Sequence, residues 1–355
     1  MKKIVPFLVA LTLISCGSDD SSTLTNPEEQ MYFPPIGSTT WETKTVESLG
    51  WNQPQVQLLL DYLELKNTKS FIVLHNGKIV FENYFNGHTD SSTWYWASAG
   101  KTLTATVTGI AEQEGFLNIN NKVSNYLGTG WTNIPLEKEN LITNKHLLTM
   151  TSGLNDALGD DVSSTNLQYI ADAGTRWAYH NVYVKLQDVI AEATNQNWSN
   201  YFNTKLRDKI GMTGLWFPYQ GLSVYRSNTR SMARFGLLAL NNGKWENNQI
   251  VPQNYFQNAT TTSQNINLSY GYLWWLNGKS SFRLPQSQFQ FNGPLVPSAP
   301  SDMYCALGKD DQKIYVVPSR KLVIIRMGDA ADNSNIALSD FDEVLWEKIN
   351  AVIVR

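Results

Sequence analysis

A serine and a lysine that stand three residues apart, Ser98 and Lys101, form the first pair in the chain that could do chemistry. They open a segment whose apolar residues recur at helical spacing as far as Gly115, which predicts a helix beginning at Ser98. Residues i and i+3 share one helix face, so the hydroxyl can reach the lysine nitrogen. The positive end of a helix lowers the pKa of a lysine placed there, and its free amides can hold an oxyanion. The pair therefore predicts a serine nucleophile activated by an easily deprotonated lysine. An exposed lysine at the start of a surface helix is the alternative.

The segments around this pair predict the elements that must position it. Apolar residues at helical spacing alternate along the chain with β-rich runs, and the dipeptide Asn76-Gly77 is a strong hairpin signal. The predicted order is a helix at 54–66, a hairpin at 70–85, a mostly helical insert at roughly 98–260, a second hairpin at 313–327 and an amphipathic helix at 335–354.

Five stretches, in this order, resemble landmarks of one known family. They are "ASAGKTLTATVTGIAEQEGFLNINNKVSNYL", "KHLLTMTSGL", "AGTRWAYHNVYVKLQDVI", "YGYLWWL" and "QKIYVVPSRKLVIIRMGD". From Phe71 onward the chain resembles the β-lactamase-related serine hydrolases, which include class C β-lactamases, DD-peptidases, esterases and 6-aminohexanoate-oligomer hydrolases. The resemblance implies an α+β fold of the β-lactamase/transpeptidase type, with an antiparallel sheet flanked by helices and a mostly helical insert. It also implies acyl transfer to Ser98.

The second catalytic element of that family is Tyr-x-Asn, and three stretches match it, beginning at Tyr84, Tyr179 and Tyr201. Only Tyr179 follows a "GTRW" turn and precedes a helix, as the family's motif does, so the resemblance assigns the roles to Tyr179 and Asn181. Beside a lysine ammonium the Tyr179 phenolate is favoured, and it could take the serine proton and return it to the leaving group. Asn181 would hold Lys101 and a substrate carbonyl. A buried tyrosine with one hydrogen bond is the alternative.

The third family element, Lys, His or Trp followed by any residue and Gly, is altered here. The matching stretch is Ala306-Leu307-Gly308. Gly308 permits close backbone approach to a substrate, and the amide of Lys309 could complete an oxyanion hole. Ala306 offers neither charge nor donor, which weakens the expectation of β-lactamase or peptidase activity. The aromatic residues near the motifs could line an apolar acyl pocket or pack in the core: Trp94, Tyr95, Trp96, Trp274 and Trp275.

The N-terminus predicts export and a lipid anchor. Two lysines precede an apolar run that is too short to span a bilayer, and "LISC" resembles a bacterial lipobox. We therefore expect a signal peptide at 1–15, cleavage before Cys16 and lipid attachment to it. Residues 16–40 form a polar tether, and 41–355 form the hydrolase domain. Acidic residues behind Cys16 resemble surface-export signals, so the expected location is the cell envelope, as an outer-membrane lipoprotein.

Composition and the remaining motifs narrow the function. With 42 % hydrophobic and 17 % charged residues among 355, the chain can bury a real core. Its formal net charge of −3 argues against binding nucleic acid. The four histidines show no metal-ligand spacing, no G-x-S-x-G elbow occurs, and no cofactor is expected. His180 should point away from Tyr179 in an extended segment, which argues against a Ser-His-Asp triad.

The sequence thus predicts a lipid-anchored serine hydrolase that cleaves a small ester or amide through an acyl-enzyme on Ser98. A lipoprotein that kept the fold but only holds a ligand in the groove is the competing hypothesis.

Overall fold

A six-stranded antiparallel sheet forms the centre of the molecule, with strand order β2-β1-β13-β12-β11-β8. The computed structural model describes residues 1, 29–219, 221–332 and 338–353, so the predicted signal peptide and Cys16 lie outside it. The strands are β1 (Thr68–His75), β2 (Lys78–Tyr84), β8 (Trp275–Leu276), β11 (Tyr304–Gly308), β12 (Gln312–Val317) and β13 (Leu322–Gly328). The chain thereby pairs its early hairpin with its late one through β1 and β13.

Both predicted hairpins are confirmed. Asn76 and Gly77 connect β1 to β2 with φ values of 50° and 84°, the pair of positive values that a type I′ turn requires. The short turn Pro318–Arg320 connects β12 to β13.

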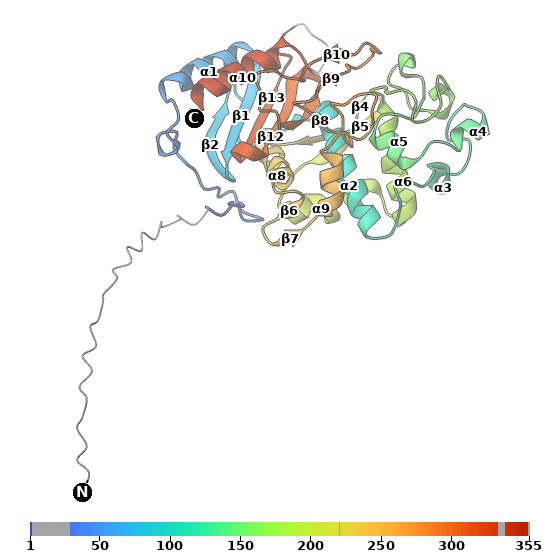
Figure 1. Ribbon diagram of the computed structural model, residues 1–355, viewed down its shortest axis with the longest axis horizontal. Helices are drawn as coiled ribbons and strands as arrows, with labels where there is room; N and C mark the ends of the chain where they lie inside the picture. The colour runs from blue at the N-terminus through green and yellow to red at the C-terminus, as the bar shows by residue number, and fades with distance from the viewer. Residues whose placement is uncertain (2–28, 220, 333–337, 354–355) are drawn as a thin grey trace. The chain divides into compact units, whose positions relative to one another are not determined.

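The helices α1 (Pro54–Leu65) and α10 (Asp340–Val352) cover one face of the sheet (Figure 1). Tyr62 of α1 stacks on Phe341 of α10 with ring centroids 5.8 Å apart. Ser339 and Asp342 close the start of α10 with a capping box. Both helices agree with the sequence prediction, and the face that they cover includes a buried ion pair between Lys313 of β12 and Asp342 of α10 at 2.9 Å.

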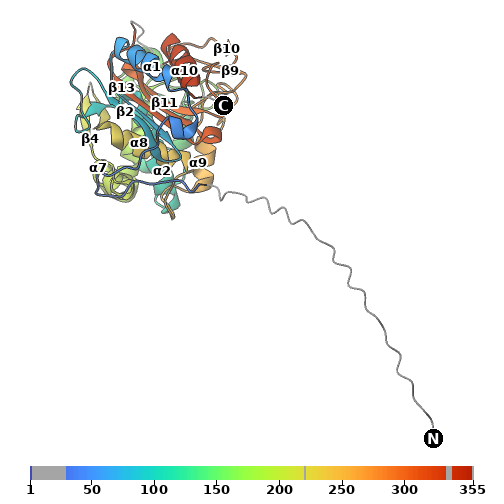
Figure 2. The ribbon, with the colours of Figure 1, turned by 90° about the vertical axis from the view of Figure 1, so that its left-hand side faces the viewer.

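The opposite face is covered by α8 (Thr229–Leu240), as Figure 2 shows, whereas α2 (Lys101–Gln113) packs against the later helices Lys185–Thr194 and Gln253–Ala259. α8 lies directly on the sheet, because a Cβ at Gly236 would come within 2.4 Å of Val323 Cγ1. Every residue of α2 from Lys101 to Ala111 is buried. A helix buried all round belongs to the core, so the helix that follows Ser98 is held rigidly from every side.

The region between α2 and α9 (Gln253–Ala259) holds more strand than the sequence indicated. A separate sheet with order β3-β5-β4 joins Trp94–Tyr95 to the hairpin of Leu222–Ser227 and Leu215–Tyr219. The other α-helices and strands of the described residues are α3 (Ser124–Leu127), α4 (Leu136–Glu139), α5 (Asn144–Leu148), α6 (Lys185–Thr194), α7 (Trp198–Phe202), β6 (Lys244–Trp245), β7 (Asn248–Gln249), β9 (Ser281–Phe282) and β10 (Phe291–Asn292).

The compact unit runs from Met31 to Arg355 and so includes residues 31–40, which composition places in the tether. Aromatic packing explains the earlier start: the Phe33 ring meets Trp245 edge-on at 5.1 Å. Arg234 also donates to the carbonyls of Pro34 and Pro35 at 3.1 and 2.9 Å. Within the part of the chain that the structure describes, no helix is long and apolar enough to cross a membrane.

Candidate active site

Ser98 lies in a tight 3₁₀ turn, Ala97–Gly100, immediately before α2. The α-helix itself starts at Lys101, three residues later than the sequence pattern indicates. Ala97 has a φ of 47°, a left-handed conformation that is strained for a residue with a Cβ. The turn is fixed on its N-terminal side, where Trp96 N donates to Tyr225 O at 2.9 Å.

Lys101 joins the serine to the Tyr-x-Asn segment. Its Nζ lies 3.0 Å from Ser98 Oγ and 3.0 Å from Asn181 Oδ1. The side chain is 2 % exposed, and the ammonium faces the rings of Tyr179 and Tyr183 at 4.8 and 4.3 Å. Burial lowers the pKa of Lys101 to about 7, against the opposing influence of the Asp160 carboxylate. Burial is thus the main cause of the low pKa, whereas the sequence argument places that cause in the helix end.

Tyr179 lies two residues before the 3₁₀ turn Asn181–Val184, and Asn181 is the first residue of this turn, which leads into α6. Burial raises the pKa of Tyr179 to about 12, although interactions with Ser98 and Trp275 favour its phenolate. Tyr179 therefore keeps its proton at neutral pH, contrary to the expectation that the neighbouring lysine would make it a phenolate. Asn181 Nδ2 donates to Asp160 Oδ1 at 2.6 Å, so both ends of its amide are occupied.

The other two Tyr-x-Asn matches lie outside this cluster. The Tyr84 hydroxyl donates to Glu82 at 2.7 Å, and the fully buried Tyr201 donates to Glu114 at 2.7 Å. His180 has extended backbone, and neither of its ring nitrogens hydrogen-bonds to a described residue. Burial lowers the pKa of His180 to about 4. The described residues around Ser98 therefore form no Ser-His-Asp triad.

The end of β11 meets the serine turn at Gly308. A Cβ at Gly308 would lie 2.4 Å from Trp96 O and 3.0 Å from Ala99 N, so only glycine allows this approach. Ala306 pairs with Ile314 inside the sheet and is 1 % exposed. Leu307 and Lys309 line the cavity on this side, which gives the altered third motif an exposed cation one residue beyond its glycine.

A cavity of about 310 Å³ opens above Ser98. Its walls include the four predicted catalytic residues, apolar side chains and two acidic residues that no sequence motif marks, Asp156 and Asp160. Asp156 forms an ion pair with Arg176 at 2.7 Å, while Asp160 lies beside Asn181. Asp160 belongs to an irregular loop, so only the fold brings it to the site.

The aromatic pocket expected from the sequence is confirmed only in part. Tyr95 and Trp275 line the cavity, and the Trp275 ring stacks on that of Tyr179 at 5.6 Å. Trp96 and Trp274 are fully buried in the core. Trp94 donates to Gly328 O through its indole nitrogen.

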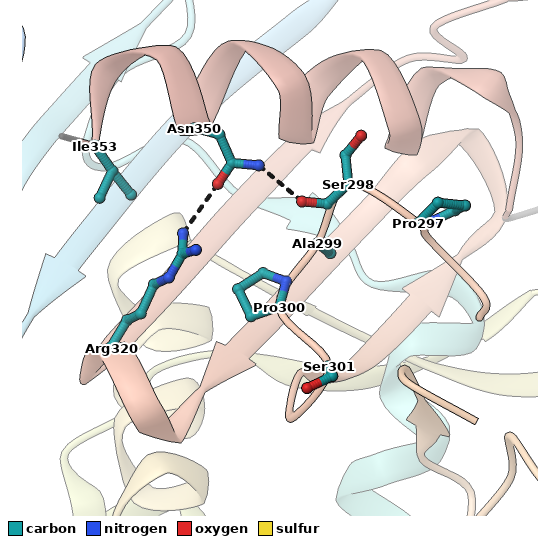
Figure 3. Close-up of a pocket in the computed structure, with 8 residues that line it drawn as sticks. All are labelled: Pro297, Ser298, Ala299, Pro300, Ser301, Arg320, Asn350 and Ile353. Atoms are coloured by element: carbon teal, nitrogen blue, oxygen red, sulfur yellow. Dashed lines mark hydrogen bonds between the residues drawn. The ribbon is translucent and has the colours of Figure 1, made fainter. Parts of the chain in front are cut away.

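A larger cavity of about 490 Å³ lies between residues 297–301 and the end of α10 (Figure 3). Its polar groups form hydrogen bonds with one another: Arg320 donates to Asn350 Oδ1 at 2.9 Å, and Asn350 donates to Ser298 O at 2.7 Å. The Ser298 hydroxyl donates to Glu343. The described residues that line this larger cavity include no lysine, so it holds no Ser-x-x-Lys pair. The smaller cavity, which contains Ser98 and Lys101, is therefore the candidate active site. Among the described residues, no group of three His, Cys, Asp or Glu side chains could hold a metal ion.

A family model of β-lactamases matches residues 68–335, which is most of the chain and includes every element of the site. The chain belongs to the β-lactamase family. This family comprises serine hydrolases that form acyl-enzymes.

This β-lactamase-family chain is similar to several proteins at low sequence identity. An uncharacterised protein of Alkalihalophilus pseudofirmus is 24 % identical over 296 residues, covering 72 % of this chain and 82 % of its own. A candidate 6-aminohexanoate-dimer hydrolase from Bacillus anthracis superposes with a TM-score of 0.68 at 19 % identity, over 90 % of this chain and 89 % of its own. A candidate β-lactamase from Bacteroides dorei gives 0.66 at 15 % identity, over 85 % and 99 %. These structures share the fold.

Proposed function

We propose that this protein hydrolyses a small ester or amide through an acyl-enzyme on Ser98. The observation that carries the proposal is the contact of 3.0 Å between Lys101 Nζ and Ser98 Oγ, made by a buried lysine whose pKa is about 7. Such a lysine is neutral in about half of the molecules at pH 7 and can accept the serine proton. A lysine at its ordinary pKa would be a fixed cation there.

Acylation starts when neutral Lys101 takes the proton of Ser98 Oγ and the oxygen attacks the substrate carbonyl carbon. The carbonyl oxygen becomes an oxyanion, which the backbone amides of Ser98 and Lys309 would stabilise. The close approach of Gly308 to the serine turn supports this pairing of the two amides. The proton then passes from Lys101 to the leaving oxygen or nitrogen as its bond to the carbonyl carbon breaks.

Tyr179 has a different part in this mechanism from the one that the sequence favoured. Its pKa of about 12 keeps the hydroxyl protonated, so it serves as a donor beside Ser98 and can relay the proton to the leaving group. Asn181 holds the Lys101 nitrogen at 3.0 Å and so fixes it against the serine. Deacylation repeats the steps with water as the nucleophile, and neutral Lys101 again takes the proton.

The substrate is small and has an apolar acyl group in this proposal. The cavity of about 310 Å³ has Trp275, Leu222, Val224 and Leu307 in its walls. The name of the Bacillus anthracis structure suggests an amide and that of the Bacteroides dorei structure a β-lactam, and both are acyl compounds that this chemistry can open. We include a cell-envelope location, with the lipid anchor at Cys16, on the grounds of the N-terminal sequence alone.

Labelling with a fluorophosphonate tests the proposal. The reagent should add one adduct to the full chain, peptide mapping should place it on Ser98, and Ser98→Ala should abolish it. Ser152→Ala is the matched control, because Ser152 is a buried serine whose Oγ accepts from Leu154 N at 3.3 Å and does not line the cavity. An adduct on Ser152, or none on folded protein, would refute the mechanism and favour the ligand-holding lipoprotein.

A further inference from the structure

The turn that carries Lys309 has an unusual backbone. It follows Gly308 and connects β11 to β12 through Lys309–Asp311. Asp310 and Asp311 both have a φ of 59°, so two successive residues with a Cβ occupy the left-handed region. Aspartate tolerates this conformation better than most residues, but the strain persists only where surrounding contacts enforce it.

Contacts from the sheet fix one side of this turn. The fully buried Arg326 of β13 donates through Nη1 to Asp310 O at 3.2 Å and to Asp311 O at 2.9 Å. Gln312 Nε2 donates to Asp310 O at 2.9 Å. The turn is therefore anchored to the central sheet by buried charged and amide donors.

A side-chain contact with Tyr95 fixes the other side. The Tyr95 hydroxyl donates to the Asp310 carboxylate, and Tyr95 precedes Ser98 by three residues at the end of β3. Burial and the Asp310 carboxylate raise the pKa of Tyr95, so its hydroxyl stays protonated and remains a donor. The hydrogen bond thus connects the segment that leads into Ser98 with the turn that contains Lys309.

We propose that the Tyr95–Asp310 hydrogen bond sets the spacing between the backbone amides of Ser98 and Lys309, which makes Tyr95 and Asp310 positioning residues of the oxyanion hole. The inference rests on the proposed acyl transfer at Ser98. An oxyanion hole acts only where its donors are already placed for the transition state, and a misplacement of about 1 Å can cost roughly 100-fold in rate. The Tyr95–Asp310 hydrogen bond joins the segment that leads into Ser98 to the turn Lys309–Asp311, whereas the contacts of Arg326 join that turn only to the sheet.

The substitution Tyr95→Phe tests this inference because it removes only the hydroxyl. With a p-nitrophenyl ester, we expect kcat to fall roughly 5- to 50-fold while KM changes less than about twofold, since the loss falls on the transition state alone. A boronic acid that forms a tetrahedral adduct on Ser98 should bind more weakly by a similar factor. Tyr201→Phe is the matched control: its hydroxyl also donates to a carboxylate, at 2.7 Å from Glu114, and it should leave kcat unchanged.

A double-mutant cycle completes the test. Asp310→Asn keeps a residue that tolerates the left-handed backbone and still offers an acceptor, so we expect a smaller loss of kcat than for Tyr95→Phe. Adding it to Tyr95→Phe should cost little more, because the bond is already absent. Additive losses, a change confined to KM, or an unchanged kcat would overturn the inference. A wild-type chain that is not labelled on Ser98 would refute the proposed acyl transfer itself. A wild-type chain that is labelled, together with an unchanged kcat for Tyr95→Phe, would refute only the positioning role of Tyr95 and Asp310.

Discussion

The Nζ atom of Lys101 lies 3.0 Å from Ser98 Oγ in a position where only 2 % of the lysine is exposed. Burial disfavours the ammonium and lowers its pKa to about 7, while Asp160 moderates the effect. The same burial that makes the lysine a base must therefore weaken the fold, and the two consequences can be measured separately.

The pH profile of kcat/KM should have an acidic limb near pH 7. Lys101 must be neutral to accept the serine proton, and its neutral fraction rises with pH through its pKa of about 7. Activity should therefore fall roughly tenfold from about pH 8 to about pH 6. Steady-state rates with a p-nitrophenyl ester measure the limb, and a flat profile from about pH 5 to about pH 8 would exclude a lysine base of this pKa.

Asp160 should control the position of that limb. Its carboxylate favours the Lys101 ammonium, so Asp160→Asn should lower the pKa of Lys101 and move the acidic limb to lower pH. Asp161→Asn is the matched control, because the Asp161 carboxylate accepts from Ser163 N at 2.8 Å and does not line the cavity. Identical limbs for the two variants would mean that Asp160 does not act on Lys101.

Replacing Lys101 by arginine should remove the base while keeping the charge. A guanidinium stays protonated at neutral pH, so Lys101→Arg cannot accept the serine proton. We expect acylation to slow by roughly two orders of magnitude or more, with the fold retained by circular dichroism. Near-normal turnover would show that the lysine acts only as a fixed cation.

Lys101 should also reduce stability below pH 10.5, its ordinary pKa. Its folded-state pKa of about 7 is lower than that value, so the unfolded chain binds more protons between the two. The cost is fully present below pH 7, declines as the pH rises and vanishes above 10.5. This cost amounts to roughly 3–5 kcal/mol. The substitution Lys101→Met removes the cost, but it also removes the hydrogen bond to Asn181, and the loss of that bond offsets part of the gain in stability. Urea unfolding should show this variant more stable than wild type at about pH 6, with the difference shrinking toward about pH 10; a difference independent of pH would contradict the argument.

Local patterns in the sequence predicted much of the fold. Asn76-Gly77 dictates its hairpin through the backbone alone, and the spacing of Ser98 and Lys101 brings the two side chains together. The β4–β5 hairpin was missed because its strands are only partly buried and show no clear alternation. The place of Asp160 in the site was not predicted, because Asp160 lies in an irregular loop whose position depends on the whole fold.

The protonation states of the site were harder to predict. The attraction of a neighbouring cation favours a Tyr179 phenolate, yet burial outweighs that attraction and raises the pKa of Tyr179 to about 12. Burial is a property of the assembled fold, and no spacing along the chain reveals it.

Neutral short-chain esters should be cleaved faster than nitrocefin, which carries a carboxylate. Ala306 is buried and offers a substrate carboxylate no partner. The cation nearest to it in the sequence that lines the cavity is the exposed ammonium of Lys309. An exposed ion pair contributes only about 0–1 kcal/mol, too little to offset removing a carboxylate from water. Lys309→Ala keeps the backbone amide, so it should reduce the residual nitrocefin turnover a fewfold and leave ester cleavage within about twofold. Comparing kcat/KM for both substrates in both proteins decides the matter: efficient nitrocefin hydrolysis that survives Lys309→Ala would mean that another residue binds the carboxylate.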